Sequence, residues 1–397
     1  MVIENRKKYK YYSLFALSAI NSFRVVFDMM NFGITAKATL GIIFYIALIS
    51  FMLCSFSEIK KSLLNPTFCL VAIIFLFTFI TTGFCKENVL VTIIILACVK
   101  DTDVKKIIKI FIIPKIIIFF IYLLFVVIKI IPDEITDVRK KFLISIERHS
   151  LGHFSPNCNF WILFPCYAGY LFVKEKIKIW EISLHFALFF ALYCLTGCRA
   201  GFYCVIILIL LYCLYCFFPK YMRKLFSLKA IRHVFFISCI VSLSLCLIVK
   251  NVGTTEFVGL RERYLNGEKL SYGKELLVRL DLISSSRILN GAKAIEKYGF
   301  SLFGQNVDYA MYVDNSFIRL LTSYGALFTV TLLFSMYYTI KKMQNEKEVF
   351  ALIIICVFAL YFNFEQVFFN VADAFIYLFA VSRKKRNKLT YKSILTV

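Results

Sequence analysis

The chain has 397 residues, of which 60% are hydrophobic, 17% aromatic and 18% charged, and its mean hydropathy is +0.77. Soluble domains have about 45–50% apolar and about 25% charged residues, so this composition excludes a soluble globular enzyme, a disordered chain and a disulfide scaffold. The net charge of +23 indicates cytoplasmic loops rich in Lys and Arg and not a nucleic-acid-binding surface. The apolar residues form blocks of roughly twenty residues, which predicts an all-α, polytopic transmembrane helical bundle.

The apolar blocks predict about twelve spans, or ten to twelve because two blocks are short. They cover residues 11–30, 39–56, 65–84, 88–99, 107–131, 159–173, 179–197, 201–218, 233–249, 316–340, 349–364 and 367–381. Lys and Arg are concentrated in alternate loops, and this asymmetry places both termini in the cytoplasm. We therefore expect one multi-pass membrane domain, residues 1–397.

Two outer loops are too long to be simple turns, and long connections usually carry function. They cover residues 132–158 and 250–315, the larger one between the ninth and tenth spans. Within the larger loop, residues 275–298 have the periodicity of a basic amphipathic helix. Such a helix lies on a membrane surface or caps the bundle, and both alternatives remain open.

The first long loop ends in a group of polar residues that suits a site. Arg148, His149, His153 and Asn157 follow one another closely there. Histidine is the side chain whose ordinary pKa lies nearest physiological pH, so two of them beside an arginine favour a catalytic site. Their spacing does not match a metal motif, and we expect no bound metal.

The outer turn before the eighth span has the sequence Thr-Gly-Cys-Arg-Ala-Gly, which contains Arg199. A planar guanidinium suits phosphate oxygens, which favours substrate binding over a role as an interface anchor. The second loop supplies Arg287 and Asp314, and the span after it begins with Arg319 and Tyr324. Asp314 faces a cavity, caps the following helix, or does both. Glu365, farther along, is a reserve carboxylate.

These features resemble the bacterial polysaccharide repeat-unit polymerases, the Wzy-like group that is related to the O-antigen ligases. The resemblance covers the whole topology and, in motifs, about 148–202 and 284–325. The motifs are Thr-x-x-Arg-x-Gly, Arg-His…Pro-Asn, and Ser-Arg…Gly…Phe-Gly-Gln…Asp-Asn-Ser-Phe…Tyr-Gly. Members often have His directly before Pro-Asn, whereas this chain has Ser155 there and His153 two residues earlier.

The resemblance implies a glycosyltransferase of the GT-C type that needs no metal or other cofactor. Its location would be the bacterial cytoplasmic membrane. Its substrates would be polyprenyl-diphosphate-linked oligosaccharides, joined at the outer face of that membrane during capsule, O-antigen or exopolysaccharide synthesis. Membrane lipid, a flippase and a chain-length regulator of the same pathway would be its partners. The residues expected to bind the diphosphate or substrate are Arg199, Arg287, Arg148, Arg319, Asn157 and Tyr324. The expected catalytic residues are Asp314, His149 and His153.

Two other functions remain open. An O-antigen ligase, which transfers glycan to a lipid A core, would have the same donor site. A transporter or flippase for lipid-linked oligosaccharides would favour charged residues in the middle of spans and a repeated layout. The polar residues of this chain are predicted at the outer face instead, and this favours the polymerase.

Overall fold

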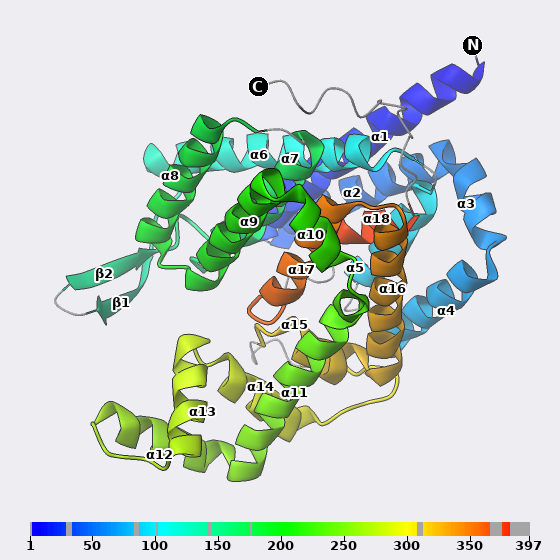
Figure 1. The fold of residues 1–397 in the computed structure, drawn as a ribbon. Coiled ribbons are helices and arrows are strands. Elements are labelled where there is room, and N and C mark those ends of the chain that lie inside the picture. Colours follow the sequence, from blue (N-terminus) through cyan, green and yellow to red (C-terminus); the bar gives the residue numbers. More distant parts are fainter. Residues whose placement is uncertain are drawn as a thin grey trace.

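In the computed structural model the described residues are 2–28, 34–82, 87–100, 102–141, 144–153, 155–174, 177–307, 313–365 and 375–381. They form an all-α protein apart from one β-hairpin (Figure 1). The first half contains the helices α1 (Val2–Asp28), α2 (Ile34–Cys54), α3 (Phe56–Leu63), α4 (Pro66–Thr81), α5 (Glu87–Cys98), α6 (Val104–Val127), α7 (Cys158–Lys174), α8 (Ile179–Thr196) and α9 (Arg199–Phe217). Within it α1 packs along α2 and α6, and α6 packs along α7.

The second half contains short helices between longer ones. Its α-helices are α10 (Pro219–Phe226), α11 (Val234–Val252), α12 (Thr254–Leu265), α13 (Tyr272–Ile283), α14 (Arg287–Tyr298), α15 (Ser316–Arg319), α16 (Ala326–Asn345), α17 (Val349–Tyr361) and α18 (Leu378–Val381). The 3₁₀ turns η1 (Lys229–His233) and η3 (Phe375–Tyr377) and the π turn η2 (Leu320–Tyr324) connect them. The predicted tenth span, 316–340, is therefore not one helix, because η2 and Gly325 separate α15 from α16.

Several helices can cross a membrane by their length and composition. These are α6, α8, α9 and the segment Lys229–Val252, which includes α11. The pair α2 and α3, bent by 75°, is a fifth candidate, and α4, α5 and α17 are shorter apolar helices. The chain is thus a helical membrane protein. The predicted last span, 367–381, has only residues 375–381 among the described ones.

The first long loop contains a hairpin that the all-α prediction missed. Strands β1 (Ile135–Lys141) and β2 (Ile144–His149) pair antiparallel, with Ile135 opposite His149 and an irregularity before Asp137. The hairpin projects from the helices (Figure 1). Ile144 and Ile146 alternate in β2 as in a strand, but the segment is too short and too charged for its pattern to stand out against the long apolar blocks.

The helix predicted over 275–298 is also wrong as a single element. It is broken at Ser284–Ser286 into α13 and α14, because Ser285 and Ser286 adopt left-handed backbone angles, with φ of 58° and 66°. The apolar face of α14, including Ile288 and Ile295, is buried against α11. This packing favours the bundle-capping alternative for α14.

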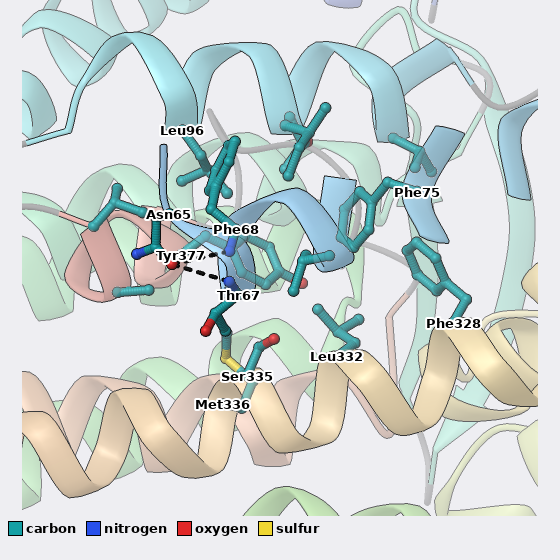
Figure 2. Close-up of a pocket in the computed structure, with 16 residues that line it drawn as sticks. Asn65, Thr67, Phe68, Phe75, Leu96, Phe328, Leu332, Ser335, Met336 and Tyr377 are labelled. Atoms are coloured by element: carbon teal, nitrogen blue, oxygen red, sulfur yellow. Dashed lines mark hydrogen bonds between the residues drawn. The ribbon is translucent and has the colours of Figure 1, made fainter. Parts of the chain in front are cut away.

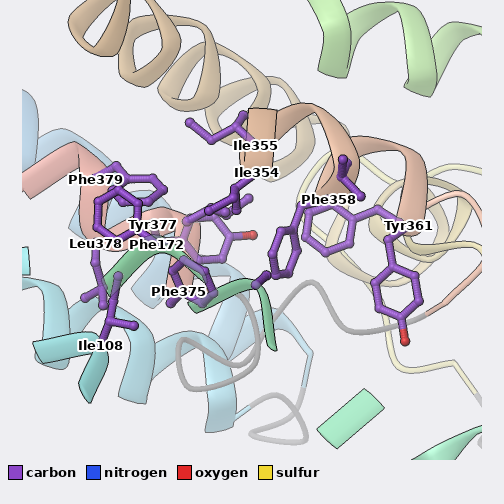
Figure 3. Packing of buried hydrophobic residues seen from close by; sticks show 14 of the residues in the cluster. Ile108, Phe172, Ile354, Ile355, Phe358, Tyr361, Phe375, Tyr377, Leu378 and Phe379 are labelled. Carbon is purple, nitrogen blue, oxygen red and sulfur yellow. The ribbon is translucent and has the colours of Figure 1, made fainter. Parts of the chain in front are cut away.

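The core is rich in aromatic side chains around α17. Phe358 of α17 meets Phe375 of the last described segment (Figure 3), with the rings 5.6 Å apart and edge to face. Phe375 in turn meets Phe379, whereas Tyr361 of α17 packs on Phe164 of α7. Buried aromatic pairs contribute about 0.5–1.5 kcal/mol beyond their area. Because α17 also contacts α7, α9 and α11, the turn that follows it lies among all three.

Candidate functional site

A cavity of about 440 Å³ brings together segments that are far apart in the sequence. Its wall comes from the end of β2, the loop before α7, the α8–α9 turn, the α13–α14 turn, the residue range before α15 and the end of α17. Five of the predicted site residues line it: Arg148, Asn157, Arg199, Arg287 and Asp314. The arginines come from three different parts of the chain, so their proximity is a property of the fold.

Arg199 is the first residue of α9 and lies at the cavity wall. Its side chain makes no hydrogen bond or ion pair with any residue that the structure describes. The first turn of α9 contains no acidic residue, and no side chain caps it. Both the guanidinium and the positive end of the helix dipole therefore favour an anion at this position.

Arg148 is bound to the turn between α8 and α9. Its Nε donates to the Thr196 carbonyl oxygen at 3.0 Å, and its Nη2 donates to Asn157 Oδ1 at 3.2 Å. Gly197 has φ of 60°, and a Cβ there would lie 3.1 Å from Arg148 Nε. A side chain at residue 197 would thus be strained and would crowd Arg148, which explains the glycine.

Arg287, the first residue of α14, is buried and has several partners. Its Nη1 donates to the Ser284 carbonyl oxygen at 2.8 Å, and its Nε donates to the Phe364 carbonyl oxygen. Its Nη2 donates to Glu365 Oε1 at 2.8 Å. Asp314 Oδ2 lies 3.7 Å from Nε, which makes an ion pair without a hydrogen bond.

Glu365 and Asp314 therefore share one guanidinium. Glu365 is fully buried, and its Oε2 accepts a hydrogen bond from Trp161 Nε1 at 2.5 Å. Burial raises the pKa of Glu365 to about 7; Arg287 opposes this rise and the charge of Asp314 adds to it. Burial also raises the pKa of Asp314, against the effect of Arg287 and Arg319. Two carboxylates beside one cation can retain a proton near neutral pH.

Asp314 does not cap the helix that follows it. The cap is Asn315, whose Oδ1 accepts from the backbone N–H groups of Phe317 at 3.0 Å and Ile318 at 3.1 Å. Asp314 Oδ1 is buried and has no hydrogen-bond partner within the described ranges. Of the roles open from the sequence, the one that remains for Asp314 is a carboxylate facing the cavity.

The two predicted catalytic histidines do not line the cavity. His149 Nδ1 is 2.6 Å from Asp133 Oδ2 at the base of the hairpin. His153 is buried and stacks on Tyr122 with ring centroids 4.4 Å apart; its ring nitrogens have no hydrogen-bond partner among the residues described. Burial lowers the pKa of His153 to about 3. The structure thus places both histidines outside the cavity that contains the predicted arginines and Asp314.

Two further predicted residues lie outside the cavity wall. Tyr324 is buried against Phe328, with ring centroids 5.3 Å apart. Arg319 is half-buried in α15 and acts on the site through its charge, which lowers the pKa of Asp314. Sequence analysis underrated Glu365 and missed Trp161. Burying a single acidic side chain in an apolar stretch costs free energy, so the position of Glu365 in such a stretch was the sequence feature that could have indicated a role for it.

A second cavity, of about 210 Å³, lies between α4, α5, α16 and α18 (Figure 2). Most of its lining is apolar, with Phe75 and Phe328 facing each other at 4.6 Å between ring centroids. Asn65 at its edge caps α4. Among the described residues that line it there is no carboxylate, arginine, lysine or histidine, so the chemistry of an active site favours the first cavity.

Comparisons with known proteins found no counterpart: no family model matches the sequence, and no curated protein or solved structure is significantly similar to it.

Proposed function

We propose that this protein is a polysaccharide polymerase, a glycosyltransferase that joins polyprenyl-diphosphate-linked oligosaccharide repeat units at the outer face of the cytoplasmic membrane. The observation that carries the proposal is the first cavity, where three arginines and Asp314 meet. A reaction that expels a diphosphate needs cations at the leaving group and a base at the attacking hydroxyl. The family resemblance of the sequence supports the same activity.

The proposed topology has about twelve spans, with residues 250–315 outside and both termini in the cytoplasm. It is supported by the basic loops of the sequence, which alternate with nearly neutral ones. In this topology the turn before Arg199 and the residues before Asp314 both belong to the outer face. The cavity is then accessible to substrates that have already crossed the membrane.

In the proposed reaction, the arginines bind the diphosphate of the donor. Arg199 offers a guanidinium that forms no hydrogen bond or ion pair with the described residues, and Arg148 with Asn157 borders the same space. The acceptor hydroxyl oxygen forms a bond to the anomeric carbon, while the bond from that carbon to the phosphate oxygen breaks. Polyprenyl diphosphate leaves with the electron pair, and its charge is stabilised by these arginines.

Asp314 is the proposed base for the acceptor hydroxyl. Its Oδ1 is free of hydrogen bonds in the described structure, and burial raises its pKa, which makes the carboxylate a better proton acceptor. Asp314 takes the hydroxyl proton as the new glycosidic bond forms. We no longer assign this role to His149 or His153, because neither lines the cavity.

The test begins with cells that lack the protein. If the protein is a polymerase, these cells should lose the polysaccharide ladder and accumulate single lipid-linked repeat units at the outer face. Those repeat units are then extracted and supplied to the purified protein in liposomes, where a ladder should form. Glycan linked to lipid A without a ladder would indicate a ligase, and repeat units retained at the cytoplasmic face would indicate a flippase.

The arginine clamp is tested with Arg199→Lys, because Arg199 has no partner within the described fold whose loss would complicate the result. We expect shorter or less polymer at a normal protein level, since a lysine cannot bind phosphate oxygens in a bidentate way. Arg279→Lys is the matched control, because Arg279 is exposed in α13 and pairs with Glu275 away from the cavity. Polymer of wild-type length and yield from Arg199→Lys would contradict the clamp.

A further inference from the structure

We propose that Glu365 is a positioning residue that holds the guanidinium of Arg287 away from Asp314 and so leaves Asp314 free as a base. This inference rests on the proposed function, because it concerns the same cavity and the same base. It adds a residue that does not touch the substrate.

The hydrogen bonds of Arg287 support this role. All three of its nitrogens donate to groups other than Asp314, namely the Ser284 carbonyl, the Phe364 carbonyl and Glu365. Asp314 Oδ2 is 3.7 Å from Nε, beyond the 2.7–3.2 Å range of N–H···O hydrogen bonds. A carboxylate beside an arginine normally forms a short, often bidentate pair, so the separation requires a competing acceptor. Glu365 is the only carboxyl group among the three acceptors of Arg287.

Glu365 is well fixed for this purpose. It is fully buried and does not line the cavity, whereas Arg287 and Phe364 do. Trp161 of α7 donates to its side chain, and its backbone carbonyl accepts from the Ser316 hydroxyl. The carboxylate thus lies behind Arg287, where α7, α14 and α15 approach the turn after α17. It acts on the substrate only through Arg287.

The charges around Asp314 show what the loss of Glu365 would do. Asp314 faces Arg287 from α14 and Arg319 from α15, with Glu365 behind Arg287. Arg148 and Arg199 line the same cavity from β2 and α9, together with the Cys198 thiol. Without the charge of Glu365, Arg287 is released to pair with Asp314. A close opposite charge lowers a carboxylate pKa by about 1–3 units, and the pairing also occupies its oxygens.

The test is Glu365→Gln, which retains the size of the side chain and an acceptor for Trp161 but removes the charge. The acid limb of the kcat/KM profile for polymerisation reports the pKa of the base in the free enzyme. We expect this limb to move to lower pH by about one unit or more, with a fall in kcat of about tenfold or more. A merely structural role would lower the rate without moving the limb, and that result would overturn the inference, as would a wild-type profile.

Glu296→Gln is the matched control. Glu296 belongs to the same helix as Arg287, but it accepts from Thr254 Oγ1 at 2.6 Å and does not line the cavity. Its profile should equal that of the wild type. If Glu365→Gln does not fold, Glu365→Asp takes its place, because it retains the charge at a greater distance from Arg287. The acid limb of Glu365→Asp is then expected below that of the wild type, by less than a full pairing of Arg287 with Asp314 would produce. An acid limb at the wild-type pH overturns the inference.

A second readout does not depend on activity. Infrared spectra of the wild type and of Asp314→Asn are recorded across pH 4–9, and their difference gives the carboxyl band of Asp314. The same difference is then measured between Glu365→Gln and the double variant Glu365→Gln, Asp314→Asn. We expect a lower titration midpoint in that background. No ladder from the wild type would overturn the proposed function alone, whereas an unchanged midpoint would overturn the role of Glu365 alone.

Discussion

The cost of burying a charge explains why the charged residues at this site are paired. Arg287 and Glu365 are both buried, and each is satisfied by the other and by further hydrogen bonds. Removal of one partner from a buried ion pair leaves an uncompensated charge, which typically costs about 3–5 kcal/mol. Asp314 differs, because one of its oxygens is not hydrogen-bonded within the described ranges. Its arrangement is better suited to chemistry than to stability.

The first prediction distinguishes the role of Asp314 as a base from the role of Asn315 as a helix cap. Asp314→Asn should slow polymerisation by about 10²–10⁴-fold at a normal protein yield, because a base is lost and the helix cap is kept. Asn315→Ala should do the reverse: it removes the cap, costs about 0.5–2 kcal/mol and lowers the amount of protein more than its turnover. Initial rates per folded protein, from liposomes with matched protein content, are the measurement. Equal turnover by Asp314→Asn and the wild type would exclude Asp314 as the base.

The second prediction concerns the pH dependence contributed by His153. Its pKa is lowered to about 3 in the folded protein, whereas an unfolded histidine has a pKa of about 6.5. Between these values the unfolded chain binds more protons, so this contribution to stability is present above about pH 6.5 and is lost as the pH falls toward 3.

His153→Phe should therefore lose less stability on acidification, by up to about 1.4 kcal/mol per pH unit below pH 6.5. Apparent melting temperatures of both proteins in detergent, compared at pH 8 and pH 5, provide the check. The variant should also polymerise at the wild-type rate at pH 8, because His153 does not line the cavity. A large loss of activity at pH 8 with an unchanged melting temperature would restore His153 as a catalytic candidate.

At the scale of elements, the contact of α14 with α11 determines where Arg287 lies. Gly291 of α14 is the point of close approach, since a Cβ there would lie 2.6 Å from Cys246 Sγ of α11. The Cys246 side chain is itself buried and has little room to turn. The spacing of the two helices, and with it the position of Arg287 at the start of α14, depends on these two small residues.

The third prediction uses this contact. Gly291→Ala should destabilise the protein by about 1–3 kcal/mol and reduce polymerisation, because overpacking displaces α14. Adding Cys246→Ala should restore both, with a favourable coupling of about 0.5 kcal/mol or more. Gly259→Ala in α12 is the control, because a Cβ there meets nothing within 4 Å. Melting temperatures and ladders of the single and double variants test it, and additive effects would exclude the proposed contact.

At the scale of the whole molecule, the parts of the fold that could be predicted are those that depend on local pattern. Most long apolar blocks coincide with a helix where the structure describes them, because a backbone in lipid must satisfy its own hydrogen bonds. The block 316–340 is an exception, since η2 and Gly325 divide it. The break at Ser284–Ser286 was missed, because tertiary packing and left-handed serines overrode a helical periodicity. The hairpin was missed because its strand signal is short.

In the site, too, local sequence features could be predicted and long-range contacts could not. Arg148, Arg199, Arg287 and Asp314 could be selected one at a time, because each lies in a predicted outer loop or turn and carries a charge that suits the expected chemistry. Their partners could not, since the contact between Arg287 and Glu365 joins residues 78 positions apart. The histidines were selected on their ordinary pKa, which burial has changed for His153. Residue type identified the candidates, and only packing separated those in the cavity from the others.

The last prediction is the orientation of the whole chain in the membrane. Basic residues concentrate in the loops assigned to the cytoplasm, among them Lys60 and the C-terminal tail, whereas residues 250–315 are nearly neutral. A cysteine introduced by Lys269→Cys should therefore react with a membrane-impermeant maleimide in intact cells, and Lys60→Cys and Lys385→Cys should react only after lysis. The native cysteines are replaced first, and each variant is accepted only if it still restores the ladder. The bent pair α2 and α3 makes Lys60 the informative position, because a pair that re-enters the membrane instead of crossing it would change which face the following segments occupy. Labelling of position 385 with protection of position 269 would reverse the orientation and place the cavity at the cytoplasmic face, which would contradict the proposed polymerisation at the outer face.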